Sequence, residues 1–177
     1  SVSDPKRAEK HFKFARLKAP SNDKITEGYV DFLTAQLRHR EALEIINVLI
    51  EDSAGNFNAR NKFFVKKGRL LKQMGQFEEA EAAFRKIIHS VPHEVSLWSD
   101  IASLKTFKTD DPDIAAIENS LALYDLDDRQ ISSAYFSLAK AHDDLQDFDQ
   151  SFFYLEQGNR LRRAQFYYNV EDDLVTM

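Results

Sequence analysis

The sequence predicts an all-α fold in which antiparallel helix pairs stack into a right-handed α-solenoid. Two observations carry this prediction. The 177 residues include only five Gly and four Pro, too few for the many tight turns of a strand-rich fold. In addition, a small residue followed four positions later by a large apolar residue recurs with a period of about 34 residues, which is typical of helical repeats. Such repeats must stack, because one pair cannot bury its apolar face alone.

The clearest repeat lies between Gly68 and Pro92. Gly68 stands 12 residues before Ala80, Ala80 stands four before Phe84, and Phe84 stands eight before Pro92. A small residue on each of two helices lets the backbones approach, the aromatic ring fills the space below, and proline ends the pair. This spacing resembles one tetratricopeptide repeat. The resemblance implies a protein-binding surface rather than a reaction.

The same spacing defines the units that come before this repeat. Ala8 and Phe12 match the second helix of a repeat, so we expect the chain to begin inside a repeat. Ala42 and Ile46 follow one repeat period after these two and mark a second unit at about 23–54. The predicted array over residues 1–165 therefore starts with a half repeat at 1–20.

Three further units complete the predicted array, at about 58–92, 94–125 and 129–163. Trp98 stands one repeat period after Phe64 and opens the unit at 94–125, whose second half departs from the pattern. In the last unit, four residues take the places of Phe64, Gly68, Ala80 and Phe84: Tyr135, Ala139, Ser151 and Leu155. Apolar residues at helical spacing predict helices near 5–18, 23–37, 40–52, 58–74, 77–90, 94–105, 112–124, 129–145 and 148–165.

Composition excludes several classes of function. The net charge of −5 argues against general binding to nucleic acid or to a membrane surface. No apolar run approaches the roughly 18 residues that predict a membrane span. The absence of cysteine excludes disulfides, thiolate metal sites and a cysteine nucleophile, and it fits a reducing cytoplasm. Because the five glycines form no phosphate-binding motif, we expect no cofactor and no catalytic site in this chain.

Basic residues concentrate in one predicted helix. Six Lys and Arg residues and no acid lie between Asn58 and Gln76. The first helix of each tetratricopeptide pair lines the concave groove, so the cations there would attract an acidic peptide or domain. The competing interpretation is an ordinary solvated helix face. The predicted partner-binding residues are Lys62, Lys66, Arg69, Lys72, Gln73 and Lys140.

Other conspicuous residues have structural interpretations. His89 and His93 are four apart, but Pro92 interrupts the helix that would align them on a metal. The Asp-rich groups are predicted to be helix caps and first-turn carboxylates. The aromatic residues recur at helical spacing and are predicted to be core: Phe14, Phe32, Phe63, Phe64, Phe84, Trp98, Phe107, Tyr135, Phe136, Phe148, Phe152 and Phe153.

A second resemblance covers residues 103–163. The segments SLKTFKTDDPDIAAI and SLAKAHDDLQDFDQSFFYLEQGNRLRR resemble the region before the catalytic domain of bacterial repeat-containing sulfotransferases, which are similar to tyrosylprotein sulfotransferases. The resemblance implies a parent enzyme whose following domain binds phosphoadenosine phosphosulfate through a PRSGT-type loop. This sequence ends at Met177 without that loop, so no catalytic residue is carried over.

The sequence therefore predicts an interaction scaffold. Its expected partner is an acidic protein or peptide, or its own downstream domain, and a homo-oligomer is possible. The alternative is that the repeats act only as a structural spacer in a sulfotransferase. Residues 166–177 are predicted to be an extension that leads to a missing domain.

Overall fold

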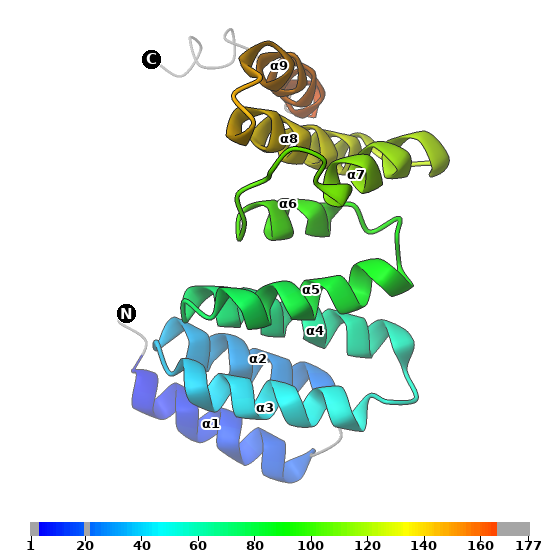
Figure 1. The fold of residues 1–177 in the computed structure, drawn as a ribbon. Helices are drawn as coiled ribbons and strands as arrows, with labels where there is room; N and C mark the ends of the chain where they lie inside the picture. The colour runs from blue at the N-terminus through cyan, green and yellow to red at the C-terminus, as the bar shows by residue number, and fades with distance from the viewer. Residues whose placement is uncertain (1–3, 20–21, 166–177) are drawn as a thin grey trace, which may run out of the picture. The chain divides into compact units, whose positions relative to one another are not determined.

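The computed structural model describes residues 4–19 and 22–165, and every regular element within these residues is an α-helix. Figure 1 shows the helices arranged as antiparallel neighbours. The predicted all-α repeat fold is confirmed. The predicted extension at 166–177 lies outside the described residues. The chain divides into two compact units, Ser1–Ile87 and Ile88–Met177.

The first unit contains four complete helices and most of a fifth. Successive helices pack on one another, α1 on α2, α2 on α3 and α3 on α4. Asparagine side chains cap the N-termini of α2 and α4. Asn22 accepts a hydrogen bond from the Ile25 amide, and Asn56 accepts one from the Ala59 amide. The helices are α1 (Pro5–Lys18), α2 (Asp23–Ala35), α3 (His39–Asp52), α4 (Phe57–Gln73) and α5 (Phe77–Ser90).

The core of the first unit is apolar and continuous across α2, α3 and α4. It is formed by Tyr29, Val30, Leu33, Ala42, Ile46, Leu49, Ile50, Phe63 and Leu70. The Phe84 ring fills the space beside Gly68 on the neighbouring helix. A Cβ atom placed on Gly68 would lie 2.5 Å from Cε1 of Phe84, so the ring occupies the space that a side chain would need. Ala80 and Phe84 are both fully buried, as the repeat spacing requires.

One turn geometry recurs in both units. The second residue after the first helix of a pair adopts a left-handed conformation at Leu37 (φ 59°), Gly75 (φ 76°) and Gln146 (φ 62°). The next amide then donates to a carbonyl five residues back, as Arg38 does to Leu33 at 2.9 Å. This arrangement ends the helix and reverses the chain. Only Gly75 lacks the steric cost that a side chain brings to this conformation.

The second unit is built around α8, against which α6, α7 and α9 pack. Asp127 and Gln130 begin α8 with reciprocal side-chain bonds, and Asp111 begins α7, so these acids are caps as predicted. The helices are α6 (Ser96–Ala102), α7 (Pro112–Leu123), α8 (Asp128–Asp144) and α9 (Phe148–Ala164).

The helix predicted at 94–105 is shorter in the structure, where α6 ends at Ala102. The segment that follows is held by α8 instead of continuing the helix. The Phe107 amide donates to a carboxylate oxygen of Asp144 at 2.8 Å, and the Phe107 ring is buried. Lys105 bonds to Asp111 and Asp113. These contacts give the Phe107 amide a hydrogen-bond acceptor and the Lys105 ammonium two counter-ions, although the segment is not helical.

The prediction that the aromatic residues are core is wrong for four of them. Phe63, Phe84, Trp98 and Phe107 are buried. In contrast, the exposed fractions are 59% for Phe14, 63% for Phe148, 68% for Phe152 and 49% for Phe153. The reason is that these four lie on α1 and α9, on helix faces that no other described helix covers.

Candidate functional site

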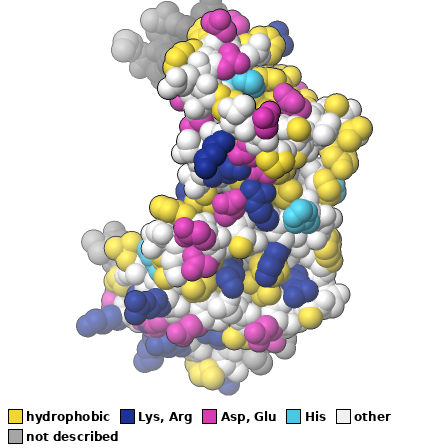
Figure 2. All heavy atoms as spheres, viewed as in Figure 1, with side chains coloured by type: hydrophobic (Ala, Val, Ile, Leu, Met, Phe, Trp, Pro, Cys, Tyr) yellow, Lys and Arg dark blue, Asp and Glu magenta, His cyan; other side chains and the backbone are white. Residues whose placement is uncertain are grey.

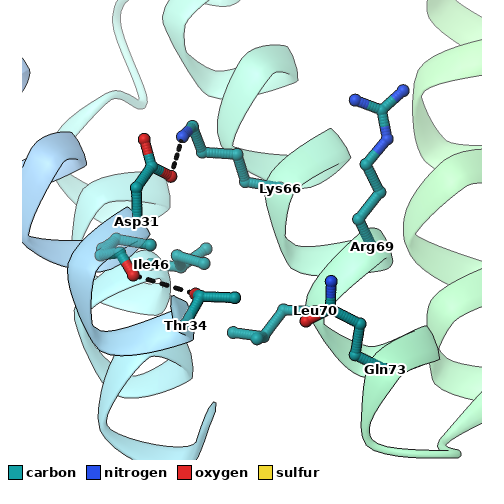
Figure 3. Close-up of a pocket in the computed structure, with 8 residues that line it drawn as sticks. Asp31, Thr34, Ile46, Lys66, Arg69, Leu70 and Gln73 are labelled. Carbon is teal, nitrogen blue, oxygen red and sulfur yellow. Dashed lines mark hydrogen bonds and ion pairs between the residues drawn. The ribbon is translucent and has the colours of Figure 1, made fainter. Parts of the chain in front are cut away.

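A cavity of about 260 Å³ opens on the first unit between α2 and α4 (Figure 3). Its floor is apolar because α3 supplies Ile46 and the facing helices supply Val30 and Leu70. Polar side chains surround this floor. Asp31 and Thr34 on α2 and Lys66, Arg69 and Gln73 on α4 line the cavity, and Figure 3 shows Lys66 reaching toward Asp31 while the Arg69 side chain points away from α2.

The charged edge of the cavity contains one ion pair between the two helices. The Lys66 ammonium lies 2.6 Å from a carboxylate oxygen of Asp31. One turn earlier on both helices, Lys62 lies 2.6 Å from Glu27, which does not line the cavity. The side chains of Asp31 and Lys62 are more than half exposed, so each pair is worth only a modest amount of stability.

A shallower hollow continues from this cavity toward the α2–α3 turn. It measures about 520 Å³ and shares Asp31, Thr34 and Gln73 with the first cavity. Leu37 and His39 extend its lining. Thr34 donates its hydroxyl hydrogen to the Val30 carbonyl at 2.9 Å, which fixes that side chain at the shared edge. The two hollows together form a groove along α2 and α4, called here the α2–α4 groove.

The structure brings together three of the six predicted partner-binding residues, Lys66, Arg69 and Gln73. Lys62 lies next to the groove and is paired with Glu27, and Lys72 does not line either hollow. The predicted partner-binding residues therefore do not form one continuous stripe of unneutralised positive charge. Carboxylates of α2 neutralise two of these residues.

Lys140 belongs to the other unit and has a structural environment. Its ammonium pairs with Asp144 and donates to the Lys105 carbonyl at 2.9 Å. It also lies 5.6 Å from the centre of the Phe107 ring. These contacts connect α8 to the segment after α6, so Lys140 has a structural role within the second unit.

Sequence reasoning missed two acids of α2, Asp31 in the α2–α4 groove and Glu27 beside it. Glu27 and Asp31 each stand 35 residues before the lysine with which they pair. This separation is close to the repeat period, so the first helices of adjacent repeats place these side chains opposite each other. Comparing charges at equivalent positions of successive repeats would have found both pairs.

The described residues contain no cluster of three His, Cys, Asp or Glu side chains that could hold a metal ion. Across the same part of the chain, no helix combines the length and the apolar character needed to cross a membrane.

Helix pairing, the repeated turn and the buried Gly, Ala and Phe contacts define an all-α fold of the tetratricopeptide type. The family model for the tetratricopeptide repeat matches residues 62–88 and 132–169, which include most of α4–α5 and α8–α9. These segments are tetratricopeptide repeats. No curated protein matches the sequence significantly.

Solved structures with the same fold match nearly the whole chain. The crystal structure of BtubC (BKLC) from P. vanneervenii has a TM-score of 0.70 and 19% identity, covering 94% of this chain and 76% of that chain. The MamA RS-1 ArsTM double mutant has a TM-score of 0.63 and 14% identity over 94% and 89% of the two chains. A Podosopora anserina kinesin light chain protein with nearly identical TPR-like repeats has a TM-score of 0.68 and 13% identity, over 93% and 90%. At these identities the likeness concerns the fold.

Proposed function

We propose that this chain is a protein-interaction scaffold whose α2–α4 groove binds a peptide that presents a carboxylate beside an apolar side chain. The observation that carries the proposal is the lining of the groove. An apolar floor of Val30, Ile46 and Leu70 lies below a rim that includes Lys66 and Arg69. A ligand apolar side chain would bury itself on the floor, and its carboxylate would bind the cations.

Asp31 gives the groove a built-in competitor for such a ligand. Its carboxylate holds the Lys66 ammonium at 2.6 Å, so a ligand carboxylate must displace it or share the lysine. Removing that negative charge should strengthen binding of an acidic peptide. An exposed ion pair is worth up to about 1 kcal/mol, which corresponds to an affinity gain of about fivefold.

The experiment begins by selecting peptides from a phage-displayed random library against the immobilised chain. We expect the recovered peptides to carry Asp or Glu close to an apolar residue. Calorimetric titration of one recovered peptide is then compared for the native chain, Asp31→Asn, Lys66→Met and the control Glu27→Gln. Asp31→Asn should tighten binding about fivefold and Lys66→Met should weaken it by a similar factor.

Glu27→Gln is a matched control, because it removes an equivalent ion pair one turn away from the groove. It should leave the affinity unchanged. If Asp31→Asn and Glu27→Gln change the affinity equally, general electrostatics and not the groove would account for binding. Recovery of no acidic peptide would overturn the proposed ligand chemistry.

The resemblance to repeat-containing sulfotransferases adds a further hypothesis, that the native ligand is the surface of a catalytic domain. The same groove chemistry would serve a domain surface that carries acidic and apolar side chains. A spacer role, the alternative, predicts that no selected peptide depends on Lys66.

A further inference from the structure

The first and last described helices both expose large apolar side chains. Phe14 and Leu17 of α1 are 59% and 82% exposed, and α1 has no buried residue. The aromatic side chains of Phe148 and Phe152 on α9 are 63% and 68% exposed. Clustered exposed apolar side chains with polar neighbours mark surfaces that associate with another molecule.

The exposed face of α1 is also strongly basic. The helix carries six Lys and Arg residues and one acid. Arg7 stands seven positions from Phe14, and Lys10 and Lys18 each stand four positions from it, so all three lie on the same face as the ring. The Lys18 ammonium lies 5.6 Å from the centre of the Phe14 ring. The single acid, Glu9, instead bonds to Arg38 and to the Tyr29 hydroxyl of the neighbouring elements.

The exposed apolar side chains of α9 have acidic neighbours. From Phe148 to Asn159, α9 carries two acids, Asp149 and Glu156, and no Lys or Arg, and its arginines follow only from Arg160 onward. Asp149 and Glu156 are exposed and stand three or four residues from Phe152 on α9, so the three side chains share one face. Figure 2 shows acidic and hydrophobic side chains intermingled on the visible surface around α9.

We propose that α1 of one copy of this chain docks on α9 of a second copy. Apolar side chains of the two faces would bury one another, and the basic rim of α1 would meet the acidic rim of α9. Pairing of two α1 faces would place like charges together. Because the two surfaces differ, the interface is head-to-tail and can add further copies. This surface is separate from the α2–α4 groove, so the inference does not depend on the proposed ligand.

The test uses two charge-reversed variants of the full chain. The α1 variant is Arg7→Glu with Lys10→Glu, and the α9 variant is Asp149→Lys with Glu156→Lys. All four residues lie at the surface, so both variants are expected to fold, which circular dichroism checks. Sedimentation velocity then measures self-association. Each variant alone brings like charges together, and its association constant should fall at least tenfold.

The decisive sample is an equimolar mixture of the two variants. The mixture joins an unaltered α9 face to an unaltered α1 face and also joins two charge-reversed faces. Association should therefore return to within about threefold of the native chain. The control Arg40→Glu changes an exposed charge on α3 and should associate like the native chain.

Three results would overturn the proposal. One is a native chain that stays monomeric at about 0.5 mM, near the dissociation constant of a small interface. Another is undiminished association of either variant alone. The last is a mixture that associates no better than its components.

Discussion

Replacing Gly68 by alanine tests the contact on which the repeat depends. The added Cβ would lie 2.5, 2.6 and 2.9 Å from three ring atoms of Phe84. Atoms at such distances overlap, so the ring or the helix must move. The ring is fully buried, and protein interiors are close-packed, so a shift of the ring would disturb its neighbours.

Two opposing effects set the size of the change. Alanine favours the middle of a helix over glycine by about 1 kcal/mol. Overpacking a core costs about 1–3 kcal/mol. Because three ring atoms are contacted and the ring is confined, we expect a cost near the upper end of that range. Subtracting the helix preference from this cost leaves a net loss of about 2 kcal/mol in the free energy of unfolding.

Urea unfolding followed by circular dichroism measures this loss, and other glycines supply the controls. A Cβ on Gly158 would lie 3.1 Å from the partly buried Phe136, which can yield, so Gly158→Ala should be nearly neutral. A Cβ on Gly55 would meet nothing within 4 Å, so Gly55→Ala should stabilise by up to about 1 kcal/mol.

A second substitution at Phe84 completes the experiment. Phe84→Leu removes the ring atoms that the new Cβ would strike. Gly68→Ala should therefore cost at least about 1 kcal/mol less in the Phe84→Leu background than in the native chain. If Gly68→Ala stabilises the native chain as helix propensity alone predicts, the close approach of α4 and α5 is not what holds this repeat together.

Two further predictions concern the first unit. Leu37 is 79% exposed and left-handed, so Leu37→Gly should raise the free energy of unfolding by about 1 kcal/mol in the same urea assay, and a loss of stability would contradict the turn geometry. Hydrogen bonds from Arg38 and Lys13 lower the pKa of Glu9 from 4.5 to about 2, so the native carboxylate stays charged in acid where the unfolded one is protonated. Stability from Glu9 is therefore present above pH 4.5 and is lost as pH falls toward 2, and Glu9→Gln should differ from the native chain at pH 7 but not at pH 2.

Most helix positions were predictable from the sequence because their signals are local. Asn56 before α4, Asp127 before α8 and Pro112 at the start of α7 act within one turn of the residues that they cap. The helix at 94–105 was predicted too long because its C-terminal half is stabilised elsewhere. Asp144, 37 residues later, binds the Phe107 amide.

The candidate site was predictable only in part. The basic residues of α4 are close together in the sequence, so Lys66, Arg69 and Gln73 could be assigned to one helix face. Their electrostatic environment could not be assigned in the same way, because Asp31 reaches Lys66 from another repeat. A cation and its counter-ion on different helices are brought together only by packing.

By itself, the sequence determined the all-α class, most helix ends and the pairing of small residues with aromatic rings, since these follow from spacing within one or two helices. The tertiary structure decided which apolar faces are covered and which charges are neutralised. Helical periodicity shows that Phe84 and Phe152 each lie on an apolar face, but it does not show whether a neighbour packs there. Phe84 is buried against α4 and Phe152 faces outward, because α5 has a helix beside that face and α9 has none among the described residues.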